Sequence, residues 1–486
     1  MPFAEMLAAL PPAFPDETLL AQIRAEVVRS GRKVVVLDDD PTGPQAIRDV
    51  FVLTEWSVAT LCAELQAPRP LFFVLTNTRA LPVGQAVALH REIAANLQAA
   101  AQQCGASYTL IVRGDSTLRG HYPDDVEALG GCDGVILAPF FEEGGRFTYD
   151  DVQWVKEDAQ LIPAAQMPYA RDQVFGYRHS NLRNWVAEKT HGRVRAAEVI
   201  AIALDVLRRG AVAQVVEMLL RAQGQTIIVN AVSYRDLEVF MLALLRAEAQ
   251  GKRFVARTAA SFVRVRAGQE GLKIKDWKLE VEKSSPNFQS STPLLKAQGQ
   301  VFNLRSSTSN GGLIIVGSHV PKSSAQLRQL LGGMTLASCE LRVQEVVAGR
   351  AAAEGARVAQ AVERELAAGR HIVVYTSREV EPRAREEALA VGQQVSALLV
   401  DVVRNLQLKP RFIIAKGGWT ASEIGTQALG VKRAYAPAPI WPGVPMWVLG
   451  EETRFAGMPY VIFPGNVGDE GALMAVVEKL AASGER

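Results

Sequence analysis

The stretch "VVVLDDDPTGPQ", residues 34–45, runs four apolar residues into three aspartates and a Pro/Gly turn. The run from Val34 to Leu37 is short and rich in β-branched residues, as expected of a strand buried on both faces of a parallel sheet. In open α/β sheets, ligands bind beyond the carboxyl ends of such strands. Three adjacent carboxylates repel one another and need a cation or donors nearby. The stretch therefore favours a ligand site over its alternative, a solvated turn whose aspartate caps the next helix.

Length and composition set the broad class of the protein. A chain of 486 residues exceeds one typical core and predicts two domains, and its 48% hydrophobic and 21% charged residues are typical of globular proteins. A net charge of +2 without a Lys/Arg-rich run predicts no nucleic-acid partner. Cys62, Cys104, Cys132 and Cys339 lack CxxC spacing, which argues against a zinc site. Because no signal-peptide pattern or long apolar run occurs, we expect a cytoplasmic protein without a membrane partner.

Short apolar runs followed by polar turns alternate with helical stretches along most of the chain. This alternation predicts an α/β fold with two α/β domains, mostly parallel sheets and an active-site cleft between them. We predict one domain over 1–265, an atypical linker over 266–310 and a second domain over 311–486. The expected strands are "VVVLD", "LFFVLTNT", "YTLIVRGDS", "DGVILAPFF", "VIAIALD", "QTIIVNA", "GGLIIVGSH", "HIVVYTSRE", "RFIIAKGGWT", "MWVLGEE" and "PYVIFPGNVG".

Polar turns that follow strands of the first half should gather at one edge of the sheet. Arginine forks match carboxylates, whereas aspartates accept hydrogen bonds from sugar hydroxyls or take a proton from one. The sequence therefore predicts a site for a small polyhydroxy acid, with Arg79 and Arg113 on its carboxylate. A salt-bridge cluster that only joins the loops is the alternative. The predicted substrate-binding residues are Asp39, Asp40, Thr42, Gly43, Asn77, Arg79, Arg113, Gly114, Asp115, Ser116 and Arg119.

The second half has Gly-rich strand-to-turn passages instead. Glycines at such turns let backbone N–H groups approach phosphate oxygens, although tight turns need glycine anyway. We expect Gly418 to need the conformational freedom of glycine. The sequence contains neither GxxxxGK[ST] nor GxGxxG after the first strand, so a P-loop and a dinucleotide fold are not predicted. The residues of these passages are Gly317, Ser318, His319, Lys416, Gly417, Gly418, Trp419, Thr420, Gly465, Asn466 and Gly468.

Taken together, the ordered motifs resemble the four-carbon acid sugar kinases, a family that includes 3-oxo-tetronate, D-threonate and erythronate kinases. The likeness runs from about residue 31 to 475, apart from 267–310, and Trp419 stands where relatives often carry isoleucine. The motifs that carry it are "LDDDPTGPQ", "TNTRAL", "RGDSTLRGHYP", "FGYRHSNLRNWVAEKT", "RTAASFV", "GSHVPKSSAQL", "AKGGWTASEIGTQALGV", "PGVPMW" and "FPGNVG".

The resemblance implies ATP-dependent phosphorylation of a four-carbon acid at its terminal hydroxyl. The "DDDPTG", "NTR" and "RGDS" turns would hold the acid, while Ser261, the "GGWT" turn and Gly465 would hold ATP. The expected partners are thus a small-molecule sugar acid and ATP, with a homodimer as one possible assembly.

Three points of the mechanism stay open in the sequence. Asp38, Asp39 or Asp115 would be the base on the attacked hydroxyl, and Mg²⁺ would bridge the phosphates of ATP, with no protein ligand assigned to the metal. Lys416 would face the transferred phosphate, unless it is an ordinary surface lysine.

Two other functions compete with the kinase. Asp38 and Asp40 fit the DxDxT pattern of haloacid-dehalogenase phosphatases, whose first aspartate is a nucleophile, and a non-catalytic sensor could bind a sugar acid.

Overall fold

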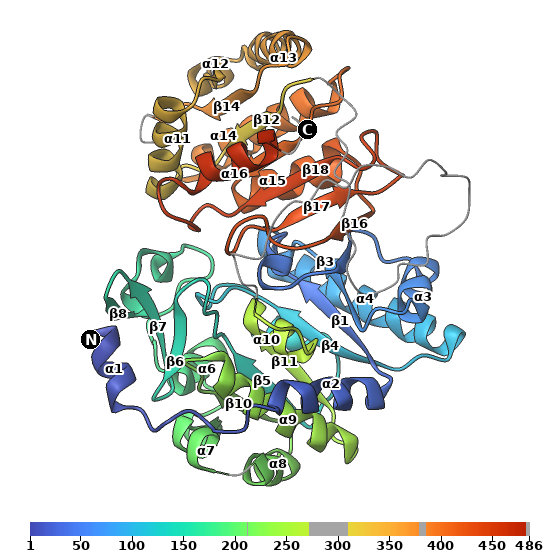
Figure 1. The fold of residues 1–486 in the computed structure, drawn as a ribbon, viewed down its shortest axis with the longest axis vertical. Helices are drawn as coiled ribbons and strands as arrows, with labels where there is room; N and C mark the ends of the chain where they lie inside the picture. Colours follow the sequence, from blue (N-terminus) through green and yellow to red (C-terminus); the bar gives the residue numbers. More distant parts are fainter. Residues whose placement is uncertain (211, 272–309, 379–384, 483–486) are drawn as a thin grey trace. The chain divides into compact units, whose positions relative to one another are not determined.

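A computed structural model describes residues 1–210, 212–271, 310–378 and 385–482, which form two compact units (Figure 1). The first unit comprises Met1–Gly271 and Tyr435–Pro439, and the second comprises Leu272–Ala434 and Ile440–Arg486. Both units alternate strands and helices around mostly parallel strands, which confirms the predicted α/β class. Residues 272–309, most of the predicted linker, lie outside the described ranges.

Parallel strands build the sheet of the first unit, in the order β2-β3-β1-β4-β11-β5-β10-β9. Their carboxyl ends therefore meet at one edge. In the register of β1 and β4, Asp38 is the Cα partner of Arg113. The bounds are β1 Lys33–Asp38, β2 Val50–Leu53, β3 Leu71–Leu75, β4 Tyr108–Arg113, β5 Gly134–Ala138, β9 Ile200–Ile202, β10 Gln225–Val229 and β11 Phe254–Thr258.

Helices cover this sheet and bury its apolar side chains. Val35 and Leu37 of β1 pack in one cluster with Leu61 of α3 and Ile93 of α4. Farther along, side chains of β4, β5, β10 and β11 pack around Trp185 of α6. The helices are α1 Phe3–Ala9, α2 Leu19–Ser30, α3 Val58–Gln66, α4 Val83–Cys104, α5 Asp124–Glu127, α6 Leu182–Lys189, α7 Leu204–Arg209, α8 Val212–Leu220, α9 Tyr234–Ala249 and α10 Ala260–Arg266.

A small antiparallel sheet of the first unit was not predicted from the sequence. It consists of β6 (Arg146–Tyr149), β7 (Val152–Glu157) and β8 (Gln160–Pro163). Its strands are short and mix charged with apolar residues, so they lack the apolar runs that revealed the main strands. The prediction also missed β11, whose sequence "FVART" carries a charged Arg257 that is nevertheless buried.

Strands of the second unit follow one another in the order β13-β14-β12-β15-β18-β17. All its neighbouring strands are parallel except β17, which runs antiparallel to β18. Apolar residues of β12, β15 and β18 pack against α11 and α16. The strands are β12 Leu313–Val316, β13 Ala337–Leu341, β14 Ile372–Thr376, β15 Ile413–Lys416, β16 Arg433–Ala436, β17 Met446–Leu449 and β18 Pro459–Phe463. The helices are α11 Pro321–Gly333, α12 Val343–Val347, α13 Ala351–Ala367, α14 Arg385–Arg404, α15 Gly418–Glu423 and α16 Ala472–Ala482.

Within the described ranges, none of the helices combines the length and the apolar composition that a membrane crossing needs.

Candidate functional site

Asp38 ends β1 as a fully buried carboxyl group. Its Oδ1 accepts a hydrogen bond from Arg113 Nη1 at 3.2 Å, while its Oδ2 is buried without a partner among the described residues. A Cβ on Gly43 would lie 1.7 Å from this Oδ2, so only glycine fits where the turn crosses the carboxyl group. Burial raises the pKa of Asp38 well above its ordinary value, against the opposing charge of Arg113.

The other two aspartates of the triple face guanidinium groups. Arg79 forms ion pairs with Asp39 and, at 2.6 Å, with Asp40. Arg113 Nη1 lies 3.1 Å from Asp40 Oδ1, and its Nη2 donates to Thr42 Oγ1 at 3.0 Å. Burial alone would raise the pKa of Asp40, but Arg79 and Arg113 hold it well below its usual range. The structure thus brings together five of the residues predicted to bind substrate, in a cluster of ion pairs.

Arg257 of β11 completes this cluster and was missed by the sequence analysis. Its Nε donates to Asp125 at 2.7 Å, and its Nη2 lies 3.9 Å from Asp39 Oδ2. The guanidinium fills the space beside two glycines: a Cβ on Gly114 would lie 1.5 Å from Nη1, and one on Gly120 would lie 2.5 Å from Nη2. Arg257 therefore explains why the turn after β4 needs glycine. The motif "RTAAS" contained the residue, but its strand was not recognised.

Asp115 and Arg119 lie on the turn after β4. Asp115 accepts from the backbone N of Thr117 at 3.1 Å, from the Thr117 hydroxyl and from Arg119 Nε at 2.6 Å. Although burial raises it, the pKa of Asp115 lies far below its ordinary value because Arg119 and Arg79 face the carboxylate. Arg119 Nη1 reaches only a weak contact, 4.0 Å from Asp172, and no hydrogen bond from Nη2 is present among the described residues. Its side chain is 25% exposed, whereas that of Arg113 is 4% exposed.

Two predicted substrate-binding residues, Asn77 and Ser116, form backbone hydrogen bonds in the turns and take no part in the ion pairs. Asn77 adopts a left-handed conformation, with φ of 51°, and its backbone N donates to Asp38 O at 3.3 Å. Ser116 accepts a hydrogen bond on its backbone O from Gln153. Both residues are half-buried at the same strand-end edge as the cluster.

The aspartate triple has the spacing of a metal site, since one oxygen from each of Asp38, Asp39 and Asp40 lies within 4.8 Å of the others. The chemistry of these residues does not fit a divalent cation. Arg79 and Arg113 already neutralise the two ionised carboxylates, and Asp38 offers only an oxygen sealed beneath Gly43. A cation here would have to displace both guanidinium groups.

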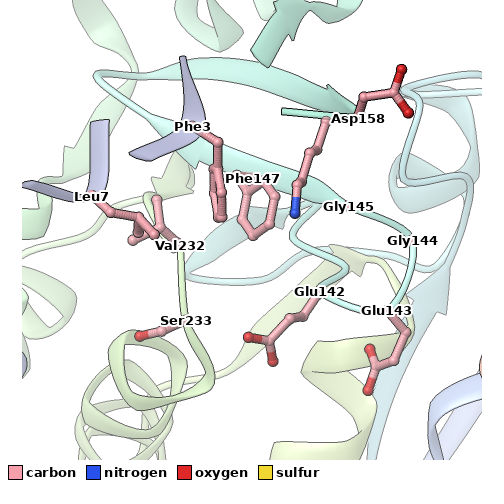
Figure 2. A pocket seen from close by; sticks show the side chains of 11 residues that line it. Phe3, Leu7, Glu142, Glu143, Gly144, Gly145, Phe147, Asp158, Val232 and Ser233 are labelled. Atoms are coloured by element: carbon pink, nitrogen blue, oxygen red, sulfur yellow. The ribbon is translucent and has the colours of Figure 1, made fainter. Parts of the chain in front are cut away.

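Ser261, predicted to hold ATP, is a buried residue of α10 in the first unit. Its Oγ lies 2.8 Å from Tyr234 Oη and accepts from the backbone N of Glu142 at 3.3 Å. A cavity of about 630 Å³ opens beside Glu142 and Glu143. Figure 2 shows both carboxylates there, with Phe3 and Phe147 forming an apolar wall on the other side.

Three Gly-rich turns of the second unit converge, as the predicted phosphate site requires. A Cβ on Gly317 would lie 2.3 Å from Thr420 Oγ1. A Cβ on Gly417 would lie 3.2 Å from Ser318 Cβ, and one on Gly465 would lie 3.0 Å from Ser318 Oγ. The ends of β12, β15 and β18 therefore touch one another through Ser318, although these turns are far apart in sequence.

The expectation that Gly418 needs the conformational freedom of glycine was wrong, because the unusual φ occurs at its neighbour, Gly417. Gly417 has φ of +117°, a value that L-residues rarely adopt, whereas Gly418 has no unusual φ and open space around its Cα. Trp419 follows with its side chain partly exposed. Asn466 is exposed, and Gly468, with φ of +81°, packs against Ala472 instead of the three-turn contact.

Lys416, at the end of β15, is fully buried and is not a surface lysine. Its Nζ donates to Pro464 O at 3.0 Å and lies 4.1 Å from the centre of the Phe463 ring. Burial, with smaller effects from Lys322 and Arg378, lowers the pKa of Lys416 to about 7. Through this hydrogen bond, Lys416 anchors the turn that begins at Pro464. On another strand end, His319 Nε2 lies 3.1 Å from Thr376 Oγ1, and burial lowers its pKa.

Comparison with known families places these two sites. Residues 34–266 match the family model described as "Sugar-binding N-terminal domain", and residues 313–473 match the one described as "Nucleotide-binding C-terminal domain". Together the two matches cover more than half of the chain. The chain belongs to this sugar- and nucleotide-binding family. The Asp–Arg cluster therefore lies in the sugar-binding domain, and the three Gly-rich turns lie in the nucleotide-binding domain.

Solved structures show the same fold over almost the whole chain. The Haemophilus influenzae protein HI1011, of the family model DUF1537, matches with 17% identity and a TM-score of 0.57, covering 92% of this chain and 99% of that chain. A Salmonella typhimurium LT2 protein provisionally described as a tRNA synthase matches with 16% identity and a TM-score of 0.60, covering 92% and 98%. No curated protein matches the sequence.

The crossing of Gly43 over Asp38 can be tested by adding one methyl group. Gly43→Ala should lower the midpoint of thermal unfolding, because overpacking a closed site costs about 1–3 kcal/mol. The matched control is Gly84→Ala in α4, where a Cβ meets nothing within 4 Å and the midpoint should hold or rise slightly. Equal midpoints for both variants would contradict the close packing at Gly43.

Lys416 should make the stability of the protein depend on pH. Between about pH 7, the pKa of the folded state, and the higher pKa of the unfolded chain, the unfolded state binds more protons. The free energy of unfolding should therefore rise with pH across this window. Below the window, it should be reduced by the full cost of burying the charged ammonium group. Lys416→Met should remove that rise, as urea unfolding at pH 6.5, 8 and 9.5 would show. Parallel pH profiles for both proteins would mean that Lys416 is not the titrating group.

Proposed function

We propose that the protein is an ATP-dependent kinase that phosphorylates a four-carbon sugar acid, a tetronate or a 3-oxo-tetronate, on a terminal hydroxyl. The family supplies a sugar-binding and a nucleotide-binding domain in one chain, which is what transfer of a phosphoryl group to a sugar requires. The observation that supports the acid is the partly exposed guanidinium of Arg119, whose terminal nitrogens make only the 4.0 Å contact with Asp172. A neutral sugar would not need it.

Arg119 is a better partner for the substrate carboxylate than the two arginines that the sequence favoured. Arg79 spends its donors on Asp39 and Asp40, and Arg113 is buried among Asp38, Asp40 and Thr42. Arg119 uses Nε on Asp115 and keeps two terminal nitrogens for a ligand. A guanidinium fork with two donors on one edge matches a carboxylate. We therefore assign the carboxylate to Arg119 and a supporting role to Arg79 and Arg113.

Two of the three candidate bases, Asp39 and Asp115, lie where they can reach a bound substrate. Asp38 is sealed beneath Gly43, so its carboxyl group is poorly placed to receive a proton from the substrate. Asp39 and Asp115 pair with arginines and can hold and orient the attacked hydroxyl. Phosphoryl transfer needs positioning and charge neutralisation more than a strong base, so such carboxylates suffice. Mg²⁺ would arrive as the counter-ion of the nucleotide phosphates, because the aspartate triple does not fit it.

The same geometry weighs against the phosphatase. A haloacid-dehalogenase-type enzyme needs its first aspartate ionised, accessible and close to Mg²⁺. Asp38 is buried, Gly43 crosses one of its oxygens, and Arg113 occupies the other, so it is neither accessible to a substrate nor open to Mg²⁺. The sensor differs from the kinase only in turnover, which an assay decides.

The assay for this function is release of ADP from ATP with a panel of tetronates and 3-oxo-tetronates. A kinase should release ADP well above the background rate only when its acid is present. An acid that binds without ADP release would identify a sensor. Release of inorganic phosphate from a phosphorylated acid without ATP would identify a phosphatase.

Arg119→Gln should raise the KM for the acid at least tenfold, since a hydrogen bond between charged groups contributes about 1.5–3 kcal/mol. The KM for ATP should change little. Arg195→Gln, at an exposed surface ion pair with Glu198, is the matched control and should leave both values unchanged. If Arg119→Gln keeps the wild-type KM for the acid, the carboxylate lies elsewhere.

A further inference from the structure

The nucleotide-binding domain carries two cations at its Gly-rich turns that the sequence motifs did not single out. Lys322 is the second residue of α11 and is exposed to solvent. Arg378 follows the end of β14 and is half-buried. The positive charges of both act on the buried Lys416, which places all three cations around the ends of neighbouring strands.

Arg378 fixes the turn after β12. Its Nη2 donates to Val316 O at 3.0 Å, and its Nη1 donates to Ser318 O. Ser318 is the residue through which the turns at Gly417 and Gly465 meet. The guanidinium charge of Arg378 is therefore held beside the point where the three turns converge. Its Nε is buried without a partner in the described part of the chain.

Within the described ranges, Arg378 and Lys416 donate to carbonyl oxygens and form no ion pair with a carboxylate. The positive charges of Lys322 and Arg378 both lower the pKa of Lys416. The first turn of α11 contains no acidic residue, although the partial positive charge of a helix N-terminus favours one. Lys322 adds a further cation there. Such an arrangement is unfavourable until an anion binds.

We infer that Lys322 is a nucleotide-binding residue that holds the terminal phosphates of a nucleoside diphosphate or triphosphate beside Ser318, and that Arg378 positions this turn and adds its charge. The inference rests on the proposed kinase function and adds the residues that recognise the phosphate chain. Several separate cations match the several charges of a polyphosphate, whereas a monophosphate would reach fewer of them. Lys416 acts through Pro464 O as a positioning residue beneath the turn.

The test is calorimetric titration of the full-length protein with ADP and with AMP. Lys322→Gln should weaken ADP binding about tenfold, as loss of one charge-assisted contact predicts, and AMP binding by less than about threefold. Arg328→Gln removes an equal charge from an exposed position farther along α11 and is the matched control. It should bind both nucleotides like the wild type.

Arg378→Lys provides the second variant, since it keeps the charge and loses the fork that holds the two carbonyl groups. This variant should weaken the binding of ADP more than the binding of AMP, and circular dichroism should confirm that it folds. If it does not fold, the test rests on Lys322→Gln. Wild-type affinity for ADP in Lys322→Gln, or equal losses for ADP and AMP, would overturn the inference while leaving the kinase proposal intact. A wild-type protein that binds no ADP would overturn both.

Discussion

The buried carboxyl group of Asp38 organises the candidate sugar site. Its backbone O accepts from Thr76 N and Oγ1, both at 2.9 Å, so it ties the end of β3 to the end of β1. Its side chain meets Arg113 of β4 and lies beneath Gly43. One residue thus connects the ends of three strands. Burial raises the pKa of this carboxyl group, while the neighbouring Arg113 opposes the shift.

The two candidate sites differ in how their charged side chains are paired. In the sugar-binding domain, five carboxyl groups face four guanidinium groups; the participants are Asp38, Asp39, Asp40, Asp115, Asp125, Arg79, Arg113, Arg119 and Arg257. A ligand there must compete with internal ion pairs, which favours an acid that can replace specific hydrogen bonds. In the nucleotide-binding domain, Arg378 and Lys416 donate to carbonyl oxygens and form no ion pair among the described residues, and the inferred polyphosphate would balance their charge.

The sequence predicted most of the strands whose apolar run ends in polar residues, although not β2, whose run "VFVL" precedes Thr54 and Glu55. It found β1, β3 and β4 and the polar residues that follow them, because a strand buried on both faces reads as continuous apolar sequence. It missed β11, where Arg257 interrupts the run and is buried only because Asp125 pairs with it. It also placed the demand for glycine at Gly418 instead of Gly417, since adjacent glycines look alike until the backbone angles are known.

By itself, the sequence determined the α/β class and which turns carry polar or Gly-rich residues, since local periodicity and turn chemistry encode both. Only the tertiary structure decided how each charged side chain is used. Arg79, Arg113 and Arg119 look equivalent in sequence and all three pair with aspartates, yet only Arg119 keeps terminal nitrogens that donate no hydrogen bond among the described residues. Lys416 likewise became a buried residue with a lowered pKa through neighbours distant in the chain. Burial and pairing depend on packing between segments, which no local pattern records.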